Sequence, residues 1–199
     1  GGDSGRTGGR LLSWYRRVPT HLYGFDLFSG FPCFSPEDGA LSPTIDKVPG
    51  GMHIAYDGEI GLDIVARHIR QTAEHEEWMG AMLRSWQLIQ GDILCRLPKF
   101  VSVQPPGWRV AFTFLDTDIY YPTRVGLETL WPHLSPGGLF VFDEYGLEAW
   151  PGETQAVDEF ATKHGLTIGR SDVPFGPSAW IQKPGGDEAD LVLSEWMPG

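Results

Sequence analysis

Apolar positions along the chain follow two spacings that alternate with each other. Residues 109–116 (RVAFTFLD) and 139–145 (LFVFDEY) are apolar at almost every position, as is typical of strands buried in a parallel sheet. Between them, residues 120–134 place apolar side chains at helical spacing. This spacing predicts a helix after Pro122, closed by the glycines of SPGG (135–138). The middle of the chain therefore predicts a buried strand, a helix and a second buried strand.

The same alternation continues on both sides of this region. Residues 21–28 predict a strand that ends at Asp26, and residues 59–86 predict one or two helices. The remaining predicted elements are a short strand QLIQ, a helix over ILCRLPKFVSV, an amphipathic helix over 152–165, and two late strands in LTIGRS and SAWIQK. Strands that alternate with helices indicate an α/β protein with a mostly parallel sheet. The last two strands have no helix between them, so we expect them to pair antiparallel.

The length of 199 residues fits one domain, which we expect over residues 1–184. Residues 29–58 are rich in Gly, Pro and Ser, and we interpret 33–58 as a long surface loop inserted in that domain. The tail over 185–199 is acidic. Subunit contact through the inserted loop, in a homo-oligomer, is one hypothesis for its role.

The charge and the cysteines exclude several classes of protein. A net charge of -11 gives no basic face for a nucleic acid, although a locally positive site for a small anion remains compatible with it. Cys33 and Cys95 form no metal-binding pattern and are expected to be reduced thiols. No apolar run is long enough for a membrane span, and the N-terminus has no signal-peptide pattern. We therefore expect a cytoplasmic protein.

Acidic residues follow four of the predicted strands. Asp26, Asp92, Asp116 and Asp143 each fall at or just after the carboxyl end of a strand. In an open α/β sheet, ligands bind outside these ends, so one cleft could collect all four side chains.

Each of these acids has a structural alternative. Asp92 and Asp118 precede predicted helices, where Asp commonly caps the first turn. Asp116, Asp143 and Glu144 are harder to explain as caps, because two buried strands would bring three carboxylates to one edge. A hard cation such as Mg²⁺ would relieve their repulsion. Asp116-Thr117-Asp118 also fits the Asp-x-Asp motif of a glycosyltransferase that binds a nucleotide sugar with Mn²⁺.

The stretch FLDTDIYYPTRVGLETLWPHLSPGGLFVFDEYG, followed by WPGETQAVDEF, resembles the macrocin O-methyltransferase family. YGFDLFSGFP (23–32) also resembles the Tyr-Gly-Phe-Asp stretch of that family. Members methylate sugar hydroxyls with S-adenosylmethionine. The resemblance spans about residues 5–183 and is specific over 109–160. It implies the Rossmann-like fold of class I methyltransferases.

The resemblance also implies a role for individual residues. Asp26 would bind the ribose hydroxyls of S-adenosylmethionine, and Asp92 would lie near its adenine. Asp116, Asp143 and Glu144 match the metal-binding acids of the family, with Mg²⁺ or a similar cation holding the oxygens of a sugar or glycoside substrate. Asp116 is also the candidate for taking the proton from the hydroxyl.

The N-terminus departs from the family pattern. Gly5 and Gly9 could supply the cofactor-binding glycines, but Leu11 stands where the family has Ser, and no apolar strand precedes them. The first strand of the sheet is therefore open to question, and the chain is either truncated or a degraded relative. Two alternatives to a methyltransferase follow: an Asp-x-Asp glycosyltransferase, or an inactive binding or scaffold protein on a methyltransferase fold.

Overall fold

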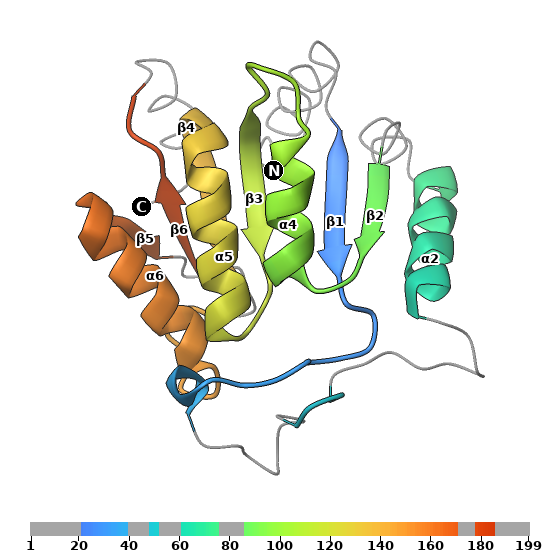
Figure 1. The fold of residues 1–199 in the computed structure, drawn as a ribbon, viewed down its shortest axis with the longest axis horizontal. Helices are drawn as coiled ribbons and strands as arrows, with labels where there is room; N and C mark the ends of the chain where they lie inside the picture. Colours follow the sequence, from blue (N-terminus) through green and yellow to red (C-terminus); the bar gives the residue numbers. More distant parts are fainter. Residues whose placement is uncertain (1–20, 40–47, 52–60, 76–85, 171–177, 186–199) are drawn as a thin grey trace, which may run out of the picture. The chain divides into compact units, whose positions relative to one another are not determined.

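The structure, a computed structural model, describes residues 21–39, 48–51, 61–75, 86–170 and 178–185 (Figure 1). The chain divides into two compact units, one formed by Gly1–Gly30 and Gly50–Asp92 and the other by Phe31–Pro49 and Ile93–Gly199. The single domain over 1–184, the insertion over 33–58 and the tail over 185–199 remain predictions. Among the described helices, none has the length and apolar character needed to cross a membrane.

The first unit contains a pair of parallel strands. Strand β1 (Leu22–Asp26) pairs with β2 (Trp86–Gln90) in a register that places Asp26 opposite Gln90. Helix α2 (Gly61–His75) contacts β2. Both strands and a helix within 59–86 were predicted from the apolar pattern, and the structure confirms them.

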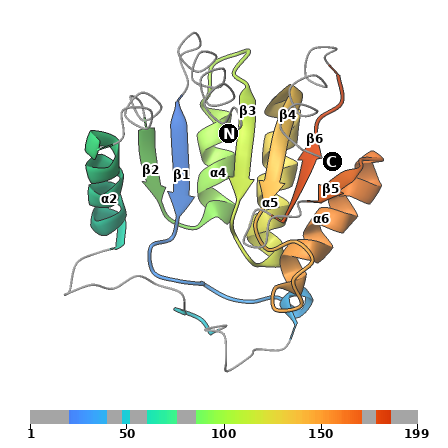
Figure 2. The same ribbon diagram turned by 180° about the vertical axis from the view of Figure 1, so that it is seen from behind.

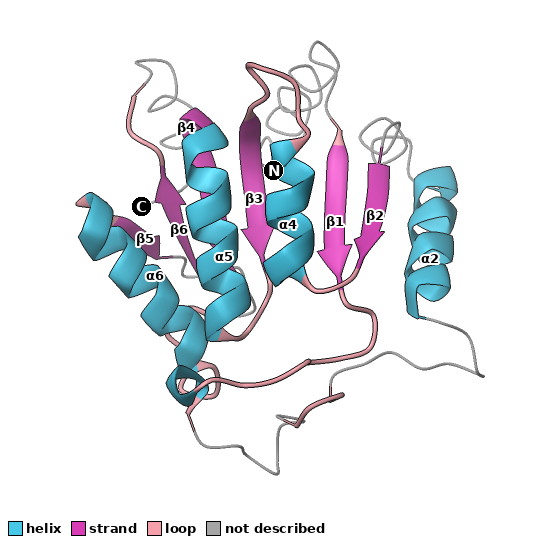
Figure 3. Cartoon of the chain, in the orientation of Figure 1, coloured by secondary structure: helices cyan, strands magenta, loops and turns pink. Residues whose placement is uncertain are grey.

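The second unit contains a four-stranded mixed sheet in the order β3-β4-β6-β5 (Figure 3). Its strands are β3 (Val110–Leu115), β4 (Leu134–Phe142), β5 (Ile168–Arg170) and β6 (Ala179–Gln182). Strands β3 and β4 are parallel, whereas β6 runs antiparallel to both β4 and β5. The predicted antiparallel pair at the end of the chain is therefore present.

In the described part of this unit, three α-helices and two short 3₁₀ helices accompany the sheet. They are η1 (Pro36–Asp38), α4 (Ile93–Ser102), α5 (Tyr120–Leu130), η2 (Trp131–His133) and α6 (Pro151–His164). Helix α5 packs against α4, α6 and β3, and it lies in front of the sheet in Figure 1 and behind it in Figure 2. The side chains buried between helices and strands include Leu127, Phe140, Phe142, Val157, Phe160 and Ile181.

Two predicted boundaries around α5 were wrong. The helix begins at Tyr120, two residues before Pro122, because proline is tolerated in the first helical turn, where its missing N–H is not needed. The helix ends at Leu130 and passes into η2, which contains Pro132, so SPGG does not close it. Residues 135–138 instead lie within β4.

The prediction that β3 is buried on both faces was also wrong. Leu115 is buried and meets α5 at Gly126, but Phe112 and Phe114 are 51% and 46% exposed. Side chains alternate along a strand, so the two phenylalanines share the face opposite Leu115. Among the described residues β3 is the edge strand of its sheet, and α5 packs on only one of its faces.

Replacing Gly165 by alanine should lower the free energy of unfolding by about 1 kcal/mol. Gly165 ends α6 in the left-handed conformation, with φ 63°, and a Cβ there would meet no atom of the described residues within 4 Å, so the expected cost is backbone strain. Urea denaturation would measure the change. Gly165→Asn is the control, because Asn tolerates the left-handed region better than Ala and should lose less stability. Equal losses in the two variants would contradict the explanation.

Candidate active site

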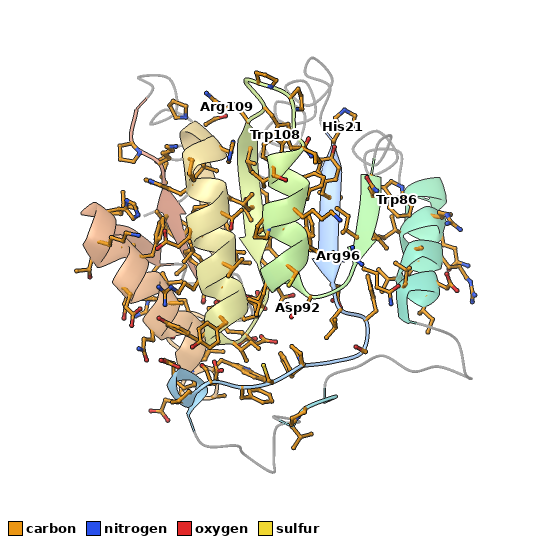
Figure 4. All side chains as sticks on the ribbon, viewed as in Figure 1. His21, Trp86, Asp92, Arg96, Trp108 and Arg109 are labelled. Atoms are coloured by element: carbon orange, nitrogen blue, oxygen red, sulfur yellow. The ribbon has the colours of Figure 1, made fainter. Side chains whose placement is uncertain are left out.

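In the first unit, Asp26 and Asp92 lie at the carboxyl end of the strand pair. Asp26 ends β1, and the N–H of Gly91 donates to the carbonyl oxygen of Asp26, at 2.9 Å, which ties the ends of both strands together. Figure 4 shows Trp86 at the start of β2 and Asp92 beyond its end. One carboxylate oxygen of Asp26 accepts the N–H of Phe28, at 2.6 Å, which orients the side chain. The structure thus brings these two predicted residues to one edge.

In the second unit, the ends of β3 and β4 bring Asp116 and Asp143 together. The strands are in register at Leu115 and Phe142, the residues directly before the two acids. The N–H of Asp143 donates to the carbonyl oxygen of Leu115, at 3.3 Å. Trp108 and Arg109, labelled in Figure 4, lie at the opposite, amino end of β3. Parallel pairing therefore places the predicted acids side by side at one end of the sheet.

Five carboxyl groups interact at this end, and we call them the acidic cluster: Asp116, Asp118, Asp143, Glu144 and Glu153. Burial raises the pKa of Glu144, and repulsion from Asp143 and Asp116 raises it further. Burial and the neighbouring carboxylates thus both disfavour a negative charge on Glu144.

Glu153, on the first turn of α6, is a member of the cluster that sequence reasoning missed. Its side chain is 0% exposed, and burial raises its pKa to about 8, with repulsion from Asp118, Glu144 and Asp116 adding to the shift. Oε1 accepts the N–H of Glu144, at 2.9 Å, whereas the buried Oε2 has no hydrogen-bond partner among the described residues. The signal was present in the sequence, because Glu153 shares helical spacing with Val157 and Phe160 and so lies on the buried face of α6.

The interpretation of Asp118 as the residue that starts the next helix was wrong. The N-cap of α5 is Ile119, and no side chain of its own caps the helix. Asp118 instead has a φ of 60°, and the N–H of Ile119 donates to the carbonyl oxygen of Thr117, at 2.6 Å, which closes a tight turn around Asp118. The first helical N–H, on Tyr120, donates to the Asp38 carboxylate.

Two aromatic residues beside the cluster have interaction partners within the protein. Trp150, at 7% exposure, stacks at an angle on Phe31 with ring centroids 5.5 Å apart. The hydroxyl of Tyr145 donates to Asp158, and the guanidinium of Arg170 lies over the Tyr145 ring.

The structure does not bring all of the predicted metal-binding and cofactor-binding residues together. Across the described residues, no three His, Cys, Asp or Glu side chains converge closely enough to form a ready-made metal site. Gly5 and Gly9 lie outside the described residues. A single cleft holding Asp26 and Asp92 with the acidic cluster stays a prediction, because the two sets belong to different compact units.

The fold is that of the class I O-methyltransferases. A crystal structure of CalS11, a calicheamicin methyltransferase, matches with a TM-score of 0.67 at 22% sequence identity, covering 89% of this chain and 68% of that one. The structure of the O-methyltransferase NovP matches with a TM-score of 0.51 at 20% identity, covering 88% of this chain and 64% of that one. The predicted Rossmann-like sheet is thereby confirmed.

Sequence comparison narrows the class to a family. Residues 103–180 match the family model of Macrocin-O-methyltransferase (TylF). A curated relative from Streptomyces olivaceus, 8-demethyl-8-(2,3-dimethoxy-alpha-L-rhamnosyl)-tetracenomycin-C 4'-O-methyltransferase, is 35% identical over 148 residues, which are 74% of this chain. The chain spans about half of that relative, 49% of its length. The chain belongs to the macrocin O-methyltransferase (TylF) family, as its motifs indicated.

Proposed function

We propose that this protein is an S-adenosylmethionine-dependent O-methyltransferase that acts on a sugar hydroxyl of a glycoside or nucleotide-linked sugar with the help of a divalent cation. Membership of the family supports the reaction type. The substrate class is supported by the name of the Streptomyces olivaceus relative, which describes methylation at the 4' position of a rhamnosyl compound.

The observation that carries the metal part of the proposal is the pairing of β3 with β4. It sets Asp116 beside Asp143, and Glu144 is close enough to both for their charges to raise its pKa. Carboxylates are the ligands that Mg²⁺ prefers, and a cation would relieve their mutual repulsion. The residues present therefore fit a hard cation in chemistry and in charge. Asp116, Asp143 and Glu144 are the proposed ligands.

The cofactor would supply the methyl group as a sulfonium, and the cation would lower the pKa of the substrate hydroxyl. The protein's own side chains would position the reactants. Asp26 would accept hydrogen bonds from the ribose hydroxyls, with Asp92 beside the adenine, at an edge where Asp26 is already oriented by Phe28. Asp116 would accept the proton of the substrate hydroxyl. Because methyl transfer is a direct displacement, most of the catalytic gain comes from this positioning.

Calorimetric titration with S-adenosylmethionine, followed by Mg²⁺, tests the proposal. We expect heat from the cofactor and then from the cation. Absence of cofactor binding would favour the inactive scaffold. Binding of a nucleotide sugar together with Mn²⁺, but not of S-adenosylmethionine, would favour the Asp-x-Asp glycosyltransferase.

Replacing Asp26 by alanine should weaken S-adenosylmethionine binding by about 10- to 100-fold, because hydrogen bonds to a charged group each contribute about 1.5–3 kcal/mol. The same titration measures the dissociation constant. Asp63→Ala, at an exposed acid in the first turn of α2, is the matched control in the same unit and should leave the affinity unchanged. An unchanged affinity in Asp26→Ala would remove Asp26 from the cofactor site.

A further inference from the structure

Asp38 is a buried acid in the segment interpreted from sequence as a surface loop. It ends the short helix η1, and its side chain is only 2% exposed. Its Oδ2 accepts the N–H and the hydroxyl of Ser35, at 2.7 and 2.9 Å. Burying a carboxylate is costly unless hydrogen bonds compensate, so this arrangement requires the partners that surround it.

The other oxygen of Asp38 reaches a distant part of the chain. Oδ1 accepts the N–H of Tyr120, at 2.7 Å, across a separation of 82 residues. Tyr120 is the first residue of α5, and Ile119 provides no side-chain cap. Asp38 therefore takes the capping role that an N-cap Asp, Ser or Thr usually fills from within the helix's own sequence.

The N–H of Tyr120, which donates to Asp38, comes directly after the turn that contains Asp116 and Asp118. That turn is strained, because Asp118 has a φ of 60° and a three-residue turn closes around it. On the helix side, the hydroxyl of Thr123 donates to the carbonyl oxygen of Ile119, at 2.8 Å, and is itself 2.8 Å from the hydroxyl of Thr117. The strained turn is thus fixed at its exit by bonds to Ile119 and Tyr120.

The absence of a side chain at Gly152 allows the Asp38 carboxylate to reach the N–H of Tyr120. Gly152 lies in the first turn of α6, one residue before Glu153 of the acidic cluster. A Cβ at this position would overlap Oδ1 of Asp38 and lie 2.8 Å from the nitrogen of Tyr120. Only glycine leaves room for the carboxylate between the starts of α5 and α6. The Pro-Gly stretch that helped to identify the family thus has a packing role in this chain.

We propose that Asp38 is a positioning residue for the acidic cluster: by capping α5 from η1, and by packing under Gly152, it holds the Asp116–Asp118 turn and the start of α6 in the arrangement that gathers the carboxylates. This inference rests on the proposed metal-assisted function. It adds a residue that touches neither metal nor substrate and acts through the backbone of Tyr120.

Four variants of the full chain test the proposal: Asp38→Ala, Asp38→Asn, Gly152→Ala and Glu128→Gln. Glu128 is the matched control, since it is an acid on α5 itself whose exposed ion pair with Lys163 does not involve Asp38, Tyr120 or Gly152. Three readouts are needed: hydrogen exchange of peptides covering 116–123, Mn²⁺ affinity by calorimetry, and S-adenosylmethionine affinity.

We expect Asp38→Ala and Gly152→Ala to speed exchange at the start of α5 and to weaken Mn²⁺ binding by about 10- to 100-fold, the usual effect of losing a partner that orients a metal ligand. S-adenosylmethionine affinity should stay within twofold of the wild type, which separates lost positioning from general unfolding. Asp38→Asn should recover part of both effects, because its amide oxygen can still accept the Tyr120 N–H. Glu128→Gln should match the wild type.

Unchanged hydrogen exchange over 116–123 in Asp38→Ala would overturn the proposal that Asp38 holds the start of α5. Faster exchange with unchanged Mn²⁺ affinity would overturn its positioning role and leave it a simple helix cap. A wild-type protein that binds no Mn²⁺ would instead overturn the proposed metal site, a result that is distinct because the exchange measurement does not depend on metal.

Discussion

Asp143→Asn is expected to abolish metal-dependent methyl transfer while leaving the fold intact. Asp143 follows β4 directly and is held beside Asp116 by strand pairing, through backbone atoms that the substitution does not change. Asparagine keeps the size but removes the charge and weakens the ligand. Removing a residue that only supports a metal ligand typically lowers activity by about 10- to 100-fold. Because Asp143 is itself a proposed ligand, the loss of turnover in Asp143→Asn should be larger.

Turnover with and without a chelator, Mn²⁺ affinity, and thermal unfolding measure this effect. Glu148→Gln is the matched control, as an exposed acid five residues further along the same loop. We expect that control to retain full activity and Asp143→Asn to unfold at the wild-type temperature. Wild-type turnover or Mn²⁺ affinity in Asp143→Asn would remove the metal-site proposal.

Glu153→Gln is expected to make the protein more stable at pH 8 than the wild type, with little difference at pH 4. The pKa of Glu153 is raised from 4.5 to about 8 in the folded protein. Below pH 4.5 the carboxyl holds its proton in both states. Between these two pKa values the unfolded chain releases the proton while the folded protein keeps it, so the free energy of unfolding falls as pH rises.

The fall should be on the order of a few kcal/mol and should be complete above the folded-state pKa. Glutamine cannot ionise, yet its side-chain oxygen can still accept the N–H of Glu144, so the variant avoids this penalty. Urea denaturation from pH 4 to 9, with a chelator present, measures the difference from the wild type. Asp158→Asn, on the exposed side of the same helix, is the control. A difference that does not vary with pH would show that Glu153 is not the buried acid described here.

The acids of the cluster divide into those that sequence predicts and those that it does not. Asp116 and Asp143 were predictable, because each follows an apolar run whose type and direction set its place at the sheet edge. The burial of Glu153 could have been predicted from its helical spacing, but an acid in a helix of mixed composition is normally assigned to the surface. Its burial depends on how α6 packs against α5.

Asp38 and Asp118 show a different limit. Asp118 precedes a helix and so has the sequence signature of a cap, yet the helix is capped by a carboxylate 82 residues earlier in the chain. No local pattern reports such a bond, because the free N–H groups at a helix start can donate to any suitably placed oxygen, near or far in sequence. The choice between the two acids is made by the packing of η1 against α6.

The sequence by itself determined the order and type of the elements, the family, and the acids at the ends of β3 and β4, because hydrophobic periodicity and local turn chemistry are written along the chain. Only the tertiary structure decided that Phe112 and Phe114 lie on an exposed face, that burial raises the pKa of Glu153, and that Asp38 caps α5. Burial, pKa and non-local hydrogen bonding depend on which elements pack together, and packing is a property of the folded chain.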